Sequence, residues 1–157
     1  MPSFGEKSNE VRDTLTPTLQ LLVDRVVKYY NITLLEGHRN ERRQDALLAD
    51  QVTKVGWPDS KHNAFPSMAV DVSPWPIPEG WGNLGRKTGK VRDDAWKERV
   101  KFYQMVAVIQ YCWAQLVEEY PDLNEYQLRS GADWDGDGDY RDQTFDDLVH
   151  VELRRKH

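Results

Sequence analysis

The stretch "SMAVDVS", Ser67–Ser73, predicts a β-strand that carries one ionisable side chain. Successive side chains of a strand point to opposite faces. Met68, Val70 and Val72 therefore share an apolar face, and Asp71 points away from it. A carboxylate turned away from the apolar layer is a candidate metal ligand.

A second predicted strand, near the C-terminus, repeats this pattern. In "LVHVEL", which ends at Leu153, His150 and Glu152 share the face opposite the valines. His62 lies in the loop before the first strand, close enough in the chain to fold back beside Asp71. Two imidazoles and one carboxylate form a ligand set of catalytic zinc, whose fourth position is left for water. The alternative is that these side chains are solvated or hydrogen-bonded without a metal.

The rest of the chain predicts helices and a few short strands. The apolar spacing indicates helices over 9–30, 40–51 and 94–120, the first bent at Pro17, the second capped by Asn40 and the third stopped by Pro121. Further strands are expected over 32–37 and 126–134, and mainly loops over 56–92. Without regular βαβ spacing, these elements predict an α+β fold with a small, mainly antiparallel sheet and flanking helices.

Length and charge restrict the class of protein. The 157 residues suit a single domain, 1–157, and 26 acidic against 21 basic residues give a net charge of −5, which argues against a nucleic-acid partner. No segment has the length of a signal peptide or approaches ~18 consecutive apolar residues. We therefore expect a soluble cytoplasmic monomer without a membrane partner, in which Cys112 is a buried, inert thiol.

Two motifs carry a family resemblance. "SKHNAFPSMAVDV" together with "DLVHVEL" resembles the zinc peptidases that cleave peptidoglycan peptides: the VanY-type D,D-carboxypeptidases and, especially, phage endolysins of the L-alanyl-D-glutamate peptidase type. The resemblance extends from "FGEKS" through "EGHRNERRQ" and "GADWDGDGDY" to the C-terminal strand. Ser60, His62, Ala69 and Asp71 fit the family pattern SxHxxGxAxD, but two residues are added and Pro66-Ser67 replaces the expected glycine. The resemblance implies a hedgehog/D,D-peptidase-like single domain.

The resemblance also implies a catalytic site. His62, Asp71 and His150 would bind zinc, and Asp147, three residues before His150, would be the general base. Because residues three apart on a strand face opposite ways, Asp147 must lie in the turn before the strand. The neighbouring Asp146 competes for this role. Glu152 could orient a zinc ligand through a hydrogen bond or face solvent.

Substrate contacts are implied for Arg39 and Gln44, which match a family clamp on a substrate carboxylate or carbonyl. The alternative is an ordinary solvated start of a helix. Ser60 could hydrogen-bond the peptide or only shape its turn.

The stretch "DWDGDGDY" begins an acidic loop, Asp133–Asp142, that could bind calcium. It matches the first half of an EF-hand, although Thr144 stands at the twelfth position, where that motif has glutamate. The candidate ligands are Asp133, Asp135, Asp137, Asp139, Tyr140 and Asp142. Some endolysins with a similar loop look calcium-dependent; a solvated acidic turn is the alternative.

The function implied is that of a zinc-dependent endolysin that cuts the peptidoglycan stem peptide, with calcium as a candidate regulator. Its expected bond is L-Ala-D-Glu, and its expected role is host cell lysis, after accumulation in the host cytoplasm and release to the wall. The alternatives are a D,D- or L,D-carboxypeptidase and a non-catalytic wall-binding module.

Overall fold

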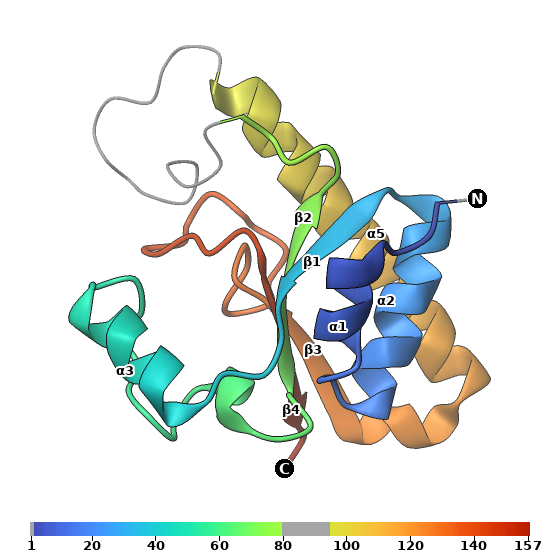
Figure 1. Cartoon of the computed structure of the whole chain (residues 1–157). Helices are drawn as coiled ribbons and strands as arrows, with labels where there is room; N and C mark the ends of the chain where they lie inside the picture. The colour runs from blue at the N-terminus through green and yellow to red at the C-terminus, as the bar shows by residue number, and fades with distance from the viewer. Residues whose placement is uncertain (1, 80–94) are drawn as a thin grey trace.

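The computed structural model describes residues 2–79 and 95–157 (Figure 1). Its helices are α1 (Glu6–Arg12), α2 (Pro17–Tyr29), α3 (Glu41–Ala49) and α5 (Ala95–Glu119), with 3₁₀ turns η1 (Lys61–Asn63) and η2 (Pro121–Glu125). Its strands are β1 (Ile32–Glu36), β2 (Ala69–Pro74), β3 (Tyr126–Ser130) and β4 (His150–Arg155). The strands form one antiparallel sheet in the order β1-β2-β4-β3, which confirms the predicted α+β class.

The two faces of this sheet have different roles. Helices α1, α2 and α5 lie on one side of it, and α3 and the acidic loop lie on the other (Figure 1). The apolar side chains of β2 and β4 enter the buried core on the helical side, as Val70, Val72, Val151 and Leu153 show. The opposite face is left for polar side chains.

Strand pairing brings the two predicted strand ligands together. In the antiparallel register of β2 and β4, Asp71 lies directly opposite His150, and Ala69 lies opposite Glu152. Directly opposed residues of an antiparallel pair have Cβ atoms about 5 Å apart. The sheet therefore places a carboxylate and an imidazole side by side without help from a loop.

The expected helix over 9–30 is wrong in one respect, because the segment forms two helices. Pro17 begins α2 rather than bending a continuous helix, and the Thr16 side chain caps α2 by accepting a hydrogen bond from the Leu19 amide. Proline lacks an amide hydrogen and clashes with the preceding turn, so it suits the first helical position better than the interior. The residues before Pro17 instead bond the backbone of Ser67, just ahead of β2.

The other helix predictions are confirmed. Asn40 caps α3, since its side chain accepts a hydrogen bond from the Arg43 amide at 2.9 Å. The long helix is α5, which ends just before Pro121. The segment 56–92, expected to be mainly loop, holds η1 and the whole of β2, which confirms the strand predicted at Ser67–Ser73. Its residues 80–92 lie outside the described part of the chain. Among the described residues, no helix is both long and apolar enough to cross a membrane.

Candidate metal centre and cleft

His62, Asp71 and His150 form a buried cluster. The His62 Nε2 atom lies 3.2 Å from Asp71 Oδ1 and 3.3 Å from His150 Nδ1, and His150 Nδ1 lies 3.5 Å from Asp71 Oδ1. All three side chains are buried. Three donor atoms from different parts of the chain thus converge on one point, as the sequence predicts.

Local structure fixes His62 in this position. Ser60 caps η1: its hydroxyl accepts a hydrogen bond from the His62 amide, and its own amide donates to the Asn63 side chain. The His62 carbonyl in turn accepts a hydrogen bond from the Arg39 amide at 2.8 Å. The loop containing His62 is therefore attached to the segment that follows β1.

Hydrogen bonds on the far side of each imidazole determine which nitrogen faces the cluster. His62 Nδ1 lies 2.6 Å from the Gly37 carbonyl, which can only accept, so this nitrogen carries a proton and Nε2 is left to ligate. His150 Nε2 donates to Glu152 at 2.8 Å, which leaves Nδ1 for the cluster. Arg129 pairs with Glu152 at 2.6 Å and holds that carboxylate in place. Partners of this kind set tautomer and orientation in metal sites.

Asp71 supplies the strongest sign that a cation fits here. Its Oδ2 accepts a hydrogen bond from Arg39 at 2.8 Å, whereas its buried Oδ1 has no hydrogen-bond donor among the described residues. A buried carboxylate oxygen without a partner carries a large desolvation cost. A divalent cation between the three donor atoms would satisfy this oxygen, and two histidines with one aspartate suit zinc.

The pKa values of the clustered side chains also indicate that this site favours positive charge. Burial opposes ionisation of Asp71, but the imidazoles of His62 and His150 beside it outweigh this effect when they are protonated and hold the pKa of Asp71 well below its usual range. Burial lowers the pKa of His150, but the neighbouring carboxylates of Asp71 and Glu152 outweigh this effect and raise that pKa to about 9. Without a cation the cluster therefore binds protons, whose positive charge a metal ion can replace.

Asp147 lies in the turn before β4, as the strand geometry requires. Its amide donates to the Gly131 carbonyl at 2.9 Å, and its carbonyl accepts from the His150 amide at 3.1 Å. A Cβ atom at Gly131 would lie 2.2 Å from the Asp147 carbonyl oxygen, so only glycine permits this close approach. Burial and the charge of Asp71 raise the pKa of Asp147 to about 6.

The competing residue Asp146 has a different environment. Its side chain is buried and forms an ion pair with Arg99, on α5. Asp146 thus anchors the turn to the helix, and Asp147 is the half-buried neighbour.

A cleft of about 590 Å³ opens over the cluster. One wall comes from the end of α3, the loop after it and η1; the other comes from Trp134 and the turn 145–149. His62, Asp71, Asp147 and His150 all line this cleft. The space suits a short peptide segment.

The three predicted substrate residues have different placements. Arg39 lines the cleft but pairs with Glu36 at 2.5 Å as well as with Asp71. Ser60 also lines the cleft, where it caps η1. Gln44 is fully buried: its amide nitrogen donates to the Val55 carbonyl at 2.6 Å, and its oxygen accepts from Asn63 at 3.1 Å. The structure does not bring Gln44 to the cleft.

In the acidic loop, the structure gathers the carboxylates of Asp133, Asp135 and Asp137. Asp133 is buried and accepts hydrogen bonds from the Gly136 and Gly138 amides, both at 3.0 Å. These two glycines have φ values of +74° and +87°, which side chains rarely adopt. The first half of the loop is therefore folded around Asp133.

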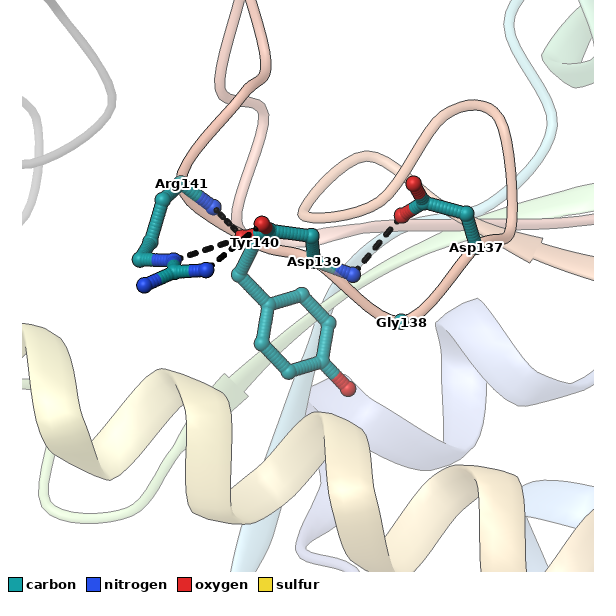
Figure 2. Close-up of a pocket in the computed structure, with 5 residues that line it drawn as sticks. All are labelled: Asp137, Gly138, Asp139, Tyr140 and Arg141. Carbon is teal, nitrogen blue, oxygen red and sulfur yellow. Dashed lines mark hydrogen bonds and ion pairs between the residues drawn. The ribbon is translucent and has the colours of Figure 1, made fainter.

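In the second half of the loop, the predicted calcium ligands contact other side chains of the protein, as Figure 2 shows for Asp137–Arg141. The Asp139 carboxylate faces Arg141, which donates from its amide and guanidinium at 2.8–2.9 Å. Tyr140 points toward α5, where its hydroxyl donates to Gln110 and its ring stacks on Tyr103. Asp142 accepts from Gln143 at 2.7 Å.

Trp134 connects this loop with the His–Asp–His cluster, a contact that the sequence did not predict. Its ring centroid lies 5.3 Å from that of His150, and the Arg129 guanidinium lies 4.9 Å above the indole. Its Nε1 donates to the Phe145 carbonyl at 2.7 Å, two residues before Asp147. The contacts of Arg129 and Trp134 cannot be predicted from the local sequence, because they depend on strand register and on the folding of the loop.

The fold and the site define the chain as an α+β domain with a buried His–Asp–His group that could hold a metal ion, in a cleft. No protein-family model matches it. In sequence it is similar to the L-alanyl-D-glutamate peptidase of Escherichia phage T5, with 26% identity over 156 residues and 96% of each chain covered. In structure it is similar to the Serratia marcescens L-Ala D-Glu endopeptidase ChiX, with a TM-score of 0.63 and 18% identity over 96% of this chain and 89% of that one. The predicted resemblance to L-alanyl-D-glutamate peptidases is confirmed.

Proposed function

We propose that the chain is a zinc-dependent peptidoglycan endopeptidase that cuts the L-Ala-D-Glu bond of the stem peptide. The observation that carries this proposal is the buried Asp71 Oδ1, which lies between two imidazoles and has no hydrogen-bond donor in residues 2–79 and 95–157. It lies in the cleft that Asp147 also lines. Both similar proteins are named for the same bond, which supports the choice of substrate.

The proposed chemistry divides between the metal and Asp147. Zinc held by His62, Asp71 and His150 supplies Lewis-acid activation of water and of the amide carbonyl. Asp147 accepts the proton of the attacking water and returns it to the leaving nitrogen, because an amide anion is a very poor leaving group. Burial raises the pKa of Asp147 to about 6, which makes its carboxylate a stronger base than an exposed one.

The residues around the metal ligands have supporting roles in this proposal. Arg39 orients Asp71 and, with Ser60, forms part of the cleft that receives the peptide. The predicted substrate contact of Gln44 stays a prediction. Its observed hydrogen bonds join α3 to the loop after it, through Val55, and to η1, through Asn63.

We also propose that calcium binds the acidic loop and regulates the site. The grouped carboxylates of Asp133, Asp135 and Asp137 support binding, with Asp139, Tyr140 and Asp142 as the remaining predicted ligands. The contacts of Trp134 with His150 and Phe145 supply a physical route from this loop to the turn that carries Asp147. Ordering of the loop by calcium would then favour the active position of Asp147.

The proposed biological role is host cell lysis by an endolysin that accumulates in the host cytoplasm and acts on the wall after release. Digestion of purified peptidoglycan by the zinc-loaded protein tests the activity. We expect new N-terminal D-glutamate and intact glycan strands, detected by mass spectrometry. Release of D-alanine alone would identify a carboxypeptidase, and binding without cleavage would identify a wall-binding module.

A further inference from the structure

The cleft contains two kinds of cationic side chain. Arg39 pairs with Glu36 and Asp71, and Arg129 pairs with Glu152, so both arginines are neutralised by carboxylates of the protein. Lys54 and Lys61 also line the cleft, and within residues 2–79 and 95–157 neither has a carboxylate at ion-pair distance. These two lysines therefore carry the positive charge that the cleft can offer to a ligand.

Lys54 is distinguished from Lys61 by its contact across the cleft. It belongs to the loop after α3, on one wall, and its Nζ lies 5.3 Å from the ring centroid of Phe145, on the other wall. Both side chains are exposed, so this cation–π contact is weak and easily replaced. A carboxylate that enters the cleft can attract the ammonium group more strongly than the ring does.

The proposed substrate supplies such a carboxylate. A D-glutamyl residue has two carboxyl groups, and because only one can continue the peptide chain, the other is free next to the bond that is cut. Phe145 lies two residues before Asp147, so the Lys54–Phe145 contact is close in the chain to the proposed general base. A charge at this point can select for the residue on the leaving side of the bond.

We infer that Lys54 is a specificity-determining residue that pairs with the free carboxylate of the D-glutamyl residue and leaves the face of Phe145 when it does so. The inference rests on the proposed function, since it names the substrate group recognised in the same cleft. It predicts a preference for a free glutamyl carboxylate over its uncharged amide.

The test compares two synthetic L-alanyl-D-glutamyl peptides, one with the free carboxyl intact and one with it converted to a primary amide. For the wild type, we expect kcat/KM to favour the carboxylate peptide by roughly three- to tenfold, mainly through KM. Lys54→Met should bring this ratio close to one, and Lys54→Arg should preserve most of it. Added salt should reduce the wild-type ratio, because the contact is exposed.

Lys61→Met is the matched control, since it removes the second lysine that lines the described part of the cleft and should leave the ratio unchanged. Calorimetric binding of the two D-glutamyl product peptides repeats the comparison without turnover. If the wild type cleaves neither substrate, the proposed function fails, and product binding still decides the role of Lys54. A wild-type ratio that persists in Lys54→Met, or equal binding of the two products by the wild type, overturns the inference.

Discussion

The His–Asp–His cluster and the acidic loop are both groups of side chains suited to a cation, but they hold their ligand atoms in different ways. In the cluster all three candidate ligands are buried, and a hydrogen bond to a neighbouring group fixes each of them. His62 donates to the Gly37 carbonyl, Asp71 accepts from Arg39, and His150 donates to Glu152. In the loop, Asp133 is buried, whereas Asp135 and Asp137 are exposed. The cluster is thus preorganised by the fold, whereas two of the three grouped carboxylates of the loop are left exposed.

Because the cluster is preorganised, we expect the largest loss of activity from a mutation of one of its three side chains. His150→Ala should remove zinc from the purified protein and reduce peptidoglycan cleavage on the order of 10³-fold or more, because the Lewis acid is lost with its ligand. Metal analysis and a cleavage assay on the same sample measure both effects. His38→Ala is the control, since His38 is only half-buried and bonds the Ala64 carbonyl away from the cluster. Full activity of a metal-free His150→Ala protein would contradict the zinc site.

The second effect separates the two neighbouring aspartates. Asp147→Asn should retain zinc and fold but lose about 10²- to 10⁴-fold in kcat, because it removes a proton acceptor and keeps the volume. Asp146→Asn should instead lower the melting temperature and leave most of the activity, because it weakens a buried ion pair with Arg99. Thermal unfolding and kinetics of the two variants, measured together, decide between them. The reverse pattern would make Asp146 the base.

These two aspartates also show how far the sequence could lead. Alternation along β2 and β4 placed Asp71 and His150 on one face. The turn position of Asp147 followed from strand geometry together with the role that the family resemblance implied for it. The partner of Asp146 could not be predicted, because Arg99 lies 47 residues away on α5 and meets it only in the folded chain. Local pattern therefore identified the candidate ligands, and tertiary contacts determined their neighbours.

The same limit applies to Gln44 and Arg39. Both follow β1 in a motif that suggested a pair of substrate contacts, yet α3 turns Gln44 into the interior while Arg39 remains at the cleft. The helix start at Asn40 was predictable from its capping side chain. Which side of the helix faces the cleft depends on the loop that packs over Gln44, and that packing leaves no signal in the local sequence.

A smaller effect concerns the hydrogen bonds that surround the cluster. Glu152→Gln keeps an acceptor for His150 but removes the charge that pairs with Arg129, so we expect zinc affinity to fall by roughly tenfold, with a correctly folded protein. Competition with a zinc chelator measures the affinity. Glu125→Gln, which removes an exposed charge near Arg155, should leave it unchanged. Equal affinities in wild type and Glu152→Gln would show that the cluster does not need this support.

The smallest effect is expected at the acidic loop, where calcium has to order side chains that the fold leaves exposed. Calcium should raise the cleavage rate of the wild type several-fold at submillimolar to millimolar concentration, because the missing glutamate of the EF-hand pattern favours weak binding. The double variant Asp135→Ala/Asp137→Ala should lose this response and keep its zinc and its melting temperature, since both side chains are exposed.

Asp133→Ala should lose the response and also unfold more easily, because its carboxylate holds the Gly136 and Gly138 amides. A chelator that binds calcium and spares zinc keeps the two metal sites separate in these assays. If wild type and double variant respond equally to calcium, the loop is a solvated acidic turn, and the contact between Trp134 and His150 serves only to pack the site.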